Sequence, residues 1–417
     1  MTHSPLIHKL VAVLPRYGKS LGGGAETLVY ELLQALKNHP ELVSEIEVWT
    51  TCAIDHRTWA NDLPAGQSIE EGIKVTRFAV SERNLELFIK HELEMQSGKI
   101  LAVDDQLEWL TNSVNSQDLY AHICNAGKDV DLILFAPYLF PTSFWGPFIY
   151  PEKSILIPCL HDEHYAYQTV FRALFKAVRG LIFNAQGEME LAQSLFALEH
   201  FTDKSAVVGM GFTPRHFPSA KTPSLLRDKP YLLYSGRKEQ GKNLPLLIEY
   251  FETYRTTTGD SDLELILIGS GEVHFRPSLP GGVIDLGFVS EQEKLDLMAG
   301  ALALCQPSLN ESFSIVMMEA WLTGVPVLVH AHSVVPREHV VNSNGGLYFA
   351  NSREFVAVVS KLKSDPLLQE SLGQNGKKYV EQVYAWEAVI ERFSQALEKF
   401  GFSQKSDDRS EQAQTQY

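Results

Sequence analysis

The stretch ESFSIVMME, residues 311–319, joins a loop to a predicted helix and carries a carboxylate at each end. An apolar run precedes it at 301–304, and a second apolar run follows after a glycine. A helix that begins near Ser314 leaves Glu311 in the loop and places Glu319 about 7.5 Å further along the axis. The order of apolar run, loop, helix and apolar run is typical of α/β architecture.

The start of this helix has the features of an anion-binding site. The first N–H groups of a helix have no partner inside it, so those of Ser312, Phe313 and Ser314 are expected to hold an anion. Glu311 at the mouth and Glu319 on the first turns would then hydrogen-bond hydroxyl groups on either side. A nucleotide sugar has this shape, because its diphosphate lies between sugar and ribose hydroxyls. Taken alone, the two glutamates also fit a helix-start acid and a solvated surface residue.

Length and charge narrow the class of protein. The chain has 417 residues and a net charge of −15, and acidic residues outnumber basic ones in both halves. The length is too great for one core and predicts two domains of about 200 residues each. The negative charge argues against nucleic acid and against a strongly anionic membrane patch as partners, while a local basic site stays open.

Targeting and cysteine signals are sparse. No apolar run reaches the roughly 18 residues of a membrane span, and residues 1–9 lack the apolar core of a signal peptide. The four cysteines have no C-x-x-C spacing, so neither a disulfide framework nor a zinc site is indicated. We therefore predict a cytoplasmic protein without a transmembrane segment, and leave peripheral contact with a membrane open.

Short apolar runs alternate with helical patterns along most of the chain, which predicts parallel sheets covered by helices. The segment 85–124 has no strand pattern and is interpreted as two or three helices. Strands are predicted in the first half at 9–14, 46–50, 75–80, 132–135, 154–158, 180–183 and 206–208. Those of the second half are predicted at 231–235, 263–268, 283–286, 301–305 and 326–329. Helices are predicted there at 244–256, 291–299 and 314–322, and from 352, 366 and 386.

A change in amino-acid composition separates the predicted strands and helices of the first half from those of the second half. Prolines cluster with Ser, Thr and Lys at 214–229, which predicts an interdomain linker between Rossmann-like domains at 1–213 and 230–385. The polar tail 404–417 lacks periodicity and is predicted to be disordered. Two Rossmann-like halves in series would place a ligand in a cleft between them, at the carboxyl ends of the strands.

Two segments that follow predicted strands have phosphate-binding chemistry. Gly22, Gly23 and Gly24 lead into a helix, where glycine lets the backbone approach a ligand closely. The match to G-x-G-x-x-G is poor and no Walker lysine follows, so the alternative is a flexible surface loop. Arg237 and Lys242 lie on a glycine-flanked turn after the strand 231–235, where a guanidinium and an ammonium can bind phosphate. An ordinary basic turn is the alternative.

A third candidate is the segment His161-Asp162-Glu163-His164, which follows the predicted strand 154–158. Histidines at i and i+3 in an extended or turn segment do not reliably share a face, so we predict no metal site. His161 instead fits a cleft-facing residue that hydrogen-bonds a sugar hydroxyl, with a structural histidine as the alternative.

Together these motifs resemble family 4 of the retaining glycosyltransferases, which has the GT-B fold of two facing Rossmann-like domains with a cleft between them. The motifs that carry the resemblance are Gly22-Gly23-Gly24, Gly236-Arg237 with Lys242-Asn243, Leu267-Ile268-Gly269-Ser270-Gly271, Leu286-Gly287-Phe288-Val289 and Glu311 to Glu319. The resemblance is strong over 231–328 and weak over 85–124, where acceptor binding is usually built. It also implies that a last helix, at about 386–403, crosses back to the first domain.

The resemblance implies roles for residues around the donor phosphates and sugar. Arg237 and Lys242 would neutralise the diphosphate, and Glu311 would contact the transferred sugar. His161 matches a family histidine near the sugar on the acceptor side. Gly23 and Gly24 would border the donor.

Further roles concern the nucleotide and the helix start. Glu319 would bind the ribose hydroxyls, and Phe288 lies on a turn that would border the base. Ser312, Phe313 and Ser314 would supply backbone N–H groups. The family commonly has glycine at the position of Ser314, but a serine keeps its N–H and is expected to cap the helix.

The function implied is a retaining, metal-independent hexosyltransferase-like enzyme in carbohydrate biosynthesis. It would use a UDP or GDP sugar without a cofactor and transfer the sugar to a hydroxyl of a glycan, a lipid-linked glycan or a small molecule. Fixed cations near the leaving diphosphate make a metal ion unnecessary. The alternatives are a nucleotide-sugar 2-epimerase of the same fold and a non-catalytic nucleotide-sugar-binding protein.

Overall fold

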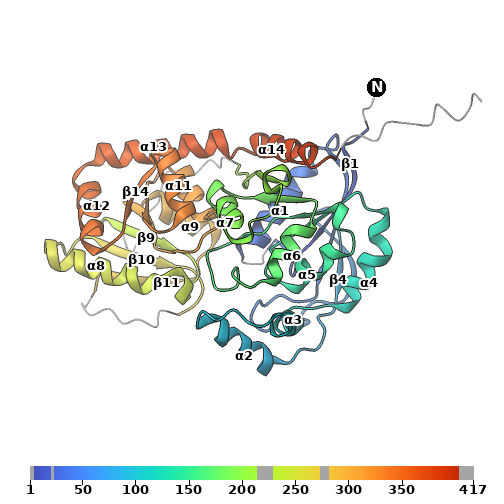
Figure 1. Ribbon diagram of the computed structural model, residues 1–417. Coiled ribbons are helices and arrows are strands. Elements are labelled where there is room, and N and C mark those ends of the chain that lie inside the picture. Colours follow the sequence, from blue (N-terminus) through green and yellow to red (C-terminus); the bar gives the residue numbers. More distant parts are fainter. Residues whose placement is uncertain (1–3, 20–22, 214–228, 273–280, 403–417) are drawn as a thin grey trace, which may run out of the picture. The chain divides into compact units, whose positions relative to one another are not determined.

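The computed structural model describes residues 4–19, 23–213, 229–272 and 281–402. The chain forms two compact units, and each contains a sheet covered by helices (Figure 1). The first unit comprises the chain up to residue 184, residues 189–208 and the chain from 390 onward. The second comprises 185–188 and 209–389. The predicted α/β class is confirmed.

The first unit contains an eight-stranded sheet in the order β3-β4-β2-β1-β5-β6-β7-β8. All neighbours pair in parallel except β3, which runs antiparallel to β4 at the edge of the sheet. The strand β3 was not predicted, because its residues are mostly polar and exposed and show no apolar alternation. The strands are β1 (Ile7–Val13), β2 (Val43–Thr51), β3 (Gly66–Glu70), β4 (Ile73–Phe78), β5 (Leu132–Phe135), β6 (Ser154–Leu156), β7 (Gly180–Phe183) and β8 (Ser205–Val207).

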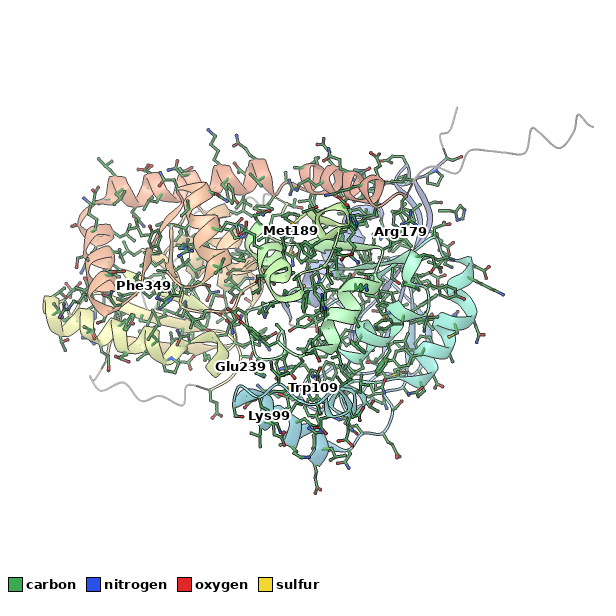
Figure 2. The ribbon with its side chains drawn as sticks, viewed as in Figure 1. Lys99, Trp109, Arg179, Met189, Glu239 and Phe349 are labelled. Carbon is green, nitrogen blue, oxygen red and sulfur yellow. The ribbon has the colours of Figure 1, made fainter. Side chains whose placement is uncertain are left out.

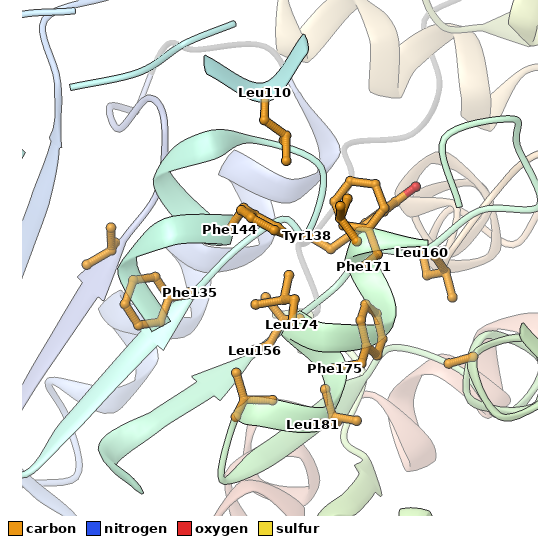
Figure 3. Close-up of a cluster of buried hydrophobic side chains, with 14 of the residues drawn as sticks. Leu110, Phe135, Tyr138, Phe144, Leu156, Leu160, Phe171, Leu174, Phe175 and Leu181 are labelled. Carbon is orange, nitrogen blue, oxygen red and sulfur yellow. The ribbon is translucent and has the colours of Figure 1, made fainter. Parts of the chain in front are cut away.

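Helices and buried aromatic side chains complete this unit. The segment 85–124 forms three helices, as its pattern predicts. Figure 3 shows part of the core, a cluster that includes Phe135 of β5, Leu156 of β6, and Phe171 and Phe175 of α6. The helices are α1 (Gly24–Leu36), α2 (Leu85–Gln96), α3 (Val103–Thr111), α4 (Gln117–Ala126), α5 (Pro141–Trp145), α6 (Val170–Ala177) and α7 (Gln186–Phe196).

The second unit contains a six-stranded, fully parallel sheet in the order β11-β10-β9-β12-β13-β14. Neither β14 nor α11 was predicted, because β14 is short and α11 contains a proline, Pro336, and has no clear apolar periodicity. The strands are β9 (Tyr231–Ser235), β10 (Glu264–Ile268), β11 (Val283–Gly287), β12 (Ala303–Gln306), β13 (Val327–His330) and β14 (Gly346–Phe349). The helices are α8 (Leu244–Thr258), α9 (Glu291–Ala299), α10 (Ile315–Leu322), α11 (Val334–Ser343), α12 (Ser352–Ser364) and α13 (Pro366–Val383).

A last helix, α14 (Trp386–Lys399), begins in the second unit and continues in the first. The segment just before α14 pairs with the segment around Phe212, where the Phe212 N–H donates a hydrogen bond to the Tyr384 carbonyl at 2.7 Å. Gly211 lies against the indole of Trp386, where an added Cβ would come within 2.2 Å of the ring. Most of the predicted linker 214–229 and the predicted tail 404–417 lie outside the described residues.

The strand order places a switch point in each sheet. In the first unit the order of connections reverses between β1 and β5, and in the second between β9 and β12. Loops that leave the carboxyl ends of such strands diverge in opposite directions, and the crevice between them is where α/β proteins bind ligands. In the part of the chain that the structure describes, no helix is both long enough and apolar enough to cross a membrane.

Candidate functional site

Two of the predicted site residues meet at the switch point of the second sheet. Lys242 follows β9 and Glu311 follows β12, and the Lys242 Nζ lies 2.6 Å from the Glu311 Oε1. The Glu311 side chain is only 11% exposed. Beside this pair, the Asn243 side chain donates to the Pro307 carbonyl at 3.2 Å and joins the two loops. The ion pair is therefore fixed by the backbone at the carboxyl edge of adjacent strands.

Arg237 lies on the turn between β9 and Lys242. Its guanidinium is partly exposed and lies 3.3 Å from the Glu239 carboxylate. The turn packs directly against the end of β10, because an added Cβ on Gly269 would lie 2.0 Å from the Gly236 carbonyl oxygen. Gly269 also has a φ of +124°, which favours glycine. Glycine at 269 thus allows the turn with Arg237 to pack against β10.

The helix α10 begins at Ile315, one residue after the predicted start. Ser314 occupies the N-cap position with a φ of +71°, and its side chain makes no capping hydrogen bond. Its hydroxyl instead accepts a hydrogen bond from the Gln306 amide at 3.1 Å. The prediction that the Ser314 side chain caps the helix is wrong, because a capping side chain normally needs extended backbone and this backbone is left-handed. The same backbone favours glycine, the residue common in the resembling family.

Phe313 anchors the loop that precedes α10. Its side chain is buried and its ring packs edge-on against His339 at 5.3 Å and Tyr384 at 5.1 Å. It also stacks on Phe212 at 6.1 Å. Burial of this ring fixes the backbone of the residues around it, including Ser312. The N–H groups at the start of α10 are thereby held by a packed core.

Glu319 lies on α10 and faces α9. Its carboxylate lies 2.9 Å from the Lys294 Nζ, and Lys294 also contacts Glu291 at the same distance. Burial by itself would lower the pKa of Lys294, but the two carboxylates outweigh it and raise that pKa. The Glu319 side chain is 17% exposed, so the bland interpretation as a solvated surface residue is not supported.

An ion pair between a buried lysine and a more exposed aspartate of the same unit was not predicted from the sequence. The Lys238 side chain is 1% exposed, and its Nζ lies 2.5 Å from the Asp285 Oδ1. Asp285 also accepts a hydrogen bond from the Gly287 N–H at 2.9 Å. The pair therefore connects the turn of Arg237 to the turn of Phe288, which is 83% exposed. The one available signal was an aspartate inside the otherwise apolar strand 283–287.

In the first unit, a buried ion pair joins the segment after β1 to the start of α1. The Arg16 Nε donates to the Glu26 carboxylate at 2.9 Å, and both side chains are nearly inaccessible. An added Cβ on Gly23 would lie 2.1 Å from the Glu26 carboxylate, while Gly24 begins α1 in open space. Gly22 lies outside the described residues. Arg16 was missed, although its place directly after the first strand was a signal.

His161 lies in the loop that follows β6, at the carboxyl edge of the first sheet. Its ring nitrogen Nδ1 is 3.8 Å from the Glu163 carboxylate, and the side chain is 30% exposed. The ring of His164 packs instead on Tyr165, at 3.9 Å between centroids, and burial lowers the pKa of His164.

Metal-binding potential is found elsewhere in the first unit. Among the described residues, one group has ligand atoms within 4.8 Å of one another: His91, Asp105 and Glu108. His91 already contacts the Glu108 carboxylate at 2.8 Å, which accounts for the cluster as an interhelical contact between α2 and α3. No disulfide links the four cysteines, all of which lie in described segments.

Comparison with known sequences identifies the relatives of the second unit. Residues 219–379 match the family described as glycosyl transferases group 1. Among characterised relatives, the MMP alpha-(1->4)-mannosyltransferase of Mycolicibacterium hassiacum is 30% identical over 115 residues, which is 27% of this chain and 28% of that protein. The chain matches less than half the length of the first curated relatives.

Solved structures share the fold over nearly the whole chain. The sucrose-phosphate synthase of Thermosynechococcus elongatus has a TM-score of 0.69 at 16% identity, over 94% of this chain and 98% of that one. Anabaena Alr3699/HepE, in complex with UDP and glucose, has a TM-score of 0.66 at 18% identity, over 94% and 99% of the two chains. The predicted resemblance and the GT-B fold are confirmed.

Proposed function

We propose that this protein, a GT-B chain with the group 1 glycosyl transferase sequence over residues 219–379, is a retaining glycosyltransferase that uses a nucleotide-diphosphate sugar. The observation that carries the proposal is the pairing of Lys242 with Glu311 at the switch point between β9 and β12. This is the position at which a sheet of this topology binds a ligand. Arg237 on the same turn adds a second cation.

The charges at this position suit the departure of a diphosphate. When the bond between the sugar C1 and the phosphate oxygen breaks, negative charge develops on the phosphate and positive charge on the sugar. Lys242 and Arg237 stabilise the first, and the α10 N-terminus adds its partial positive charge. Glu311, whose carboxylate contacts Lys242, is proposed to contact the sugar. These interactions strengthen as the bond breaks, which is the requirement for catalysis.

The acceptor hydroxyl completes the reaction on the same face. Its oxygen forms the new bond to C1, and its proton passes to the departing diphosphate oxygen, so no separate base is required. Glu311 and Glu319 both already contact lysines, which leaves neither as an obvious base for attack from the opposite face. This supports retention of the anomeric configuration.

The donor and acceptor classes follow from related proteins and from the site. Alr3699/HepE holds UDP and glucose, and the Mycolicibacterium relative is a mannosyltransferase, so we propose a UDP or GDP hexose as donor. Exposed Phe288, on the turn connected to Lys238 and Asp285, offers a ring for the base. The acceptor is proposed to be a hydroxyl of a glycan, a lipid-linked glycan or a small molecule.

The proposal is tested by incubating the protein with α-linked UDP and GDP hexoses, alone and with acceptor extracts. Early-time NMR of the new anomeric proton is expected to show an α-linked product, formed only when acceptor is present. A β linkage would contradict retention. Epimerised donor without acceptor would indicate an isomerase, and binding without any reaction a non-catalytic protein.

A further inference from the structure

The first unit contains an insertion that packs directly on the loop of His161. We use "the insertion" for residues 85–111, which contain α2 and α3, and "the His161 loop" for residues 157–169, between β6 and α6. Lys99 and Trp109 of the insertion are labelled in Figure 2. Because β6 is parallel to its neighbours, the His161 loop starts at the carboxyl edge of the sheet.

Glu92 of α2 is the charged residue in this contact. One carboxylate oxygen accepts a hydrogen bond from the Trp109 Nε1 at 2.8 Å, and the other accepts one from the Tyr165 hydroxyl at 2.5 Å. The rings of Trp109 and Tyr165 are stacked, with centroids 5.5 Å apart and planes 10° apart. Both Glu92 oxygens thus accept hydrogen bonds within the unit, and Tyr165 is the residue through which Glu92 contacts the His161 loop.

Two buried glutamines add further links. The Gln168 side chain accepts from the Leu101 N–H at 3.0 Å and donates to the Lys99 and His164 carbonyls at 3.2 Å. The Gln106 side chain accepts from the Val170 N–H at 3.0 Å, at the end of the loop. The insertion therefore contacts the middle and the end of the His161 loop.

The Glu92 contact differs from the glutamine contacts in its charge. A hydrogen bond to an ionised acceptor is stronger than one between neutral groups. Burial raises the pKa of Glu92, and the hydrogen bonds from Tyr165 and Trp109 oppose that rise. Loss of the Tyr165 hydroxyl would leave one oxygen of a half-buried carboxylate without its partner, which is costly.

We propose that Glu92 is a positioning residue, which holds the His161 loop through Tyr165 in the conformation that receives the acceptor. The inference rests on the proposed function, because it assigns the His161 loop to acceptor recognition. It gives the insertion a role in acceptor binding although Glu92 itself does not touch the substrate. The donor residues of the second unit are not involved.

The test compares three variants of the full-length protein: Glu92→Gln, Tyr165→Phe and, as a matched control on the exposed face of α2, Glu86→Gln. Hydrogen exchange of the peptide 157–169 is measured by mass spectrometry without substrates. Exchange is expected to become about 10-fold faster in the first two variants and to stay unchanged in the control. The acceptor KM is expected to rise about 10-fold in the same two variants, while the Kd for free UDP or GDP, measured by calorimetry, stays unchanged.

Each arm of this experiment has an outcome against the proposal. Unchanged exchange and unchanged acceptor KM in Tyr165→Phe would overturn it, and this conservative variant keeps the test valid even if Glu92→Gln fails to fold. Equal weakening of nucleotide binding would show a general structural effect and also overturn it. If the wild-type protein transfers no sugar, the proposed function is wrong. This failure is distinguished from failure of the positioning role because hydrogen exchange of 157–169 would still become faster in Glu92→Gln.

Discussion

In the second unit the candidate side chains Lys242, Glu311 and Glu319 lie in ion pairs, whereas in the first unit the His161 loop is held by a network of mostly uncharged groups. Lys242 with Glu311 and Lys294 with Glu319 each join different elements of the second unit. A ligand with phosphate and hydroxyl groups can take the place of one partner in such a pair. The proposed function assigns the charged donor to the second unit and the hydroxyl-bearing acceptor to the His161 loop of the first.

The largest effect expected from this difference is on turnover. Lys242→Ala and Arg237→Ala each remove a cation near the proposed leaving group, so we expect kcat/KM to fall by 10²-fold or more, or about 3 kcal/mol for each. Steady-state kinetics with donor and acceptor measure it. Lys361→Ala, which removes a remote exposed lysine paired with Asp365, is the control. Activity within about threefold of wild type in both site variants would remove these cations from the mechanism.

A second effect concerns pH and the core beneath Phe313. Burial lowers the pKa of His339 to about 3. In the unfolded chain His339 binds a proton near pH 6.5, but in the folded unit it stays neutral until a much lower pH. The contribution of His339 to the free energy of unfolding is therefore complete above pH 6.5 and is lost as the pH falls. Between pH 7.5 and 5 this one group is expected to contribute about 2 kcal/mol to the loss.

Thermal melting at the two pH values measures this contribution as a difference between variants. His339→Phe is expected to lose less stability on acidification than the wild type does. His332→Gln changes an exposed histidine nearby and is the control. The same pH dependence in wild type and His339→Phe would mean that His339 does not titrate as its burial requires.

A smaller effect is expected for Glu319, which distinguishes ground-state binding from catalysis. Glu319→Gln is expected to weaken the binding of free nucleotide by about 10-fold and to have a smaller effect on the turnover of bound donor. The reason is that the ground state and the transition state share the proposed contact with the ribose. Calorimetry with UDP and GDP measures the Kd. Glu291→Gln removes the other, more exposed carboxylate on Lys294 and is the matched control. Equal losses in the two variants would assign the effect to Lys294, and an unchanged Kd would remove Glu319 from the site.

The smallest change is expected on chelation. EDTA should leave transfer essentially unaltered, because the proposed mechanism assigns to Arg237 and Lys242 the positive charge that a metal ion would bring to the diphosphate. The control is the same assay with added Mg²⁺ or Mn²⁺. If EDTA abolished activity and either ion restored it, the metal-free mechanism would be wrong. A metal ion would then be expected at the donor phosphates.

The loops that carry several candidate residues could be predicted from local signals. Arg237 and Lys242 were predicted on the turn after the strand 231–235, and Glu311 in the loop before the helix at 314, and the structure shows that Lys242 and Glu311 touch. The backbone conformation of Ser314 could not be predicted from local sequence signals. Its positive φ depends on how the loop packs around Phe313, and this packing turned the hydroxyl toward Gln306 instead of the helix.

The sequence by itself determined most of the strands and helices and the two-part α/β architecture, because apolar periodicity and glycine or proline boundaries are local properties. Only the tertiary structure decided which polar groups pair. Lys238 and Asp285 are 47 residues apart, and Glu92 and Tyr165 are 73 apart. No spacing rule links such residues. They meet because parallel strands align their carboxyl ends and because the insertion packs on a loop from a distant part of the chain.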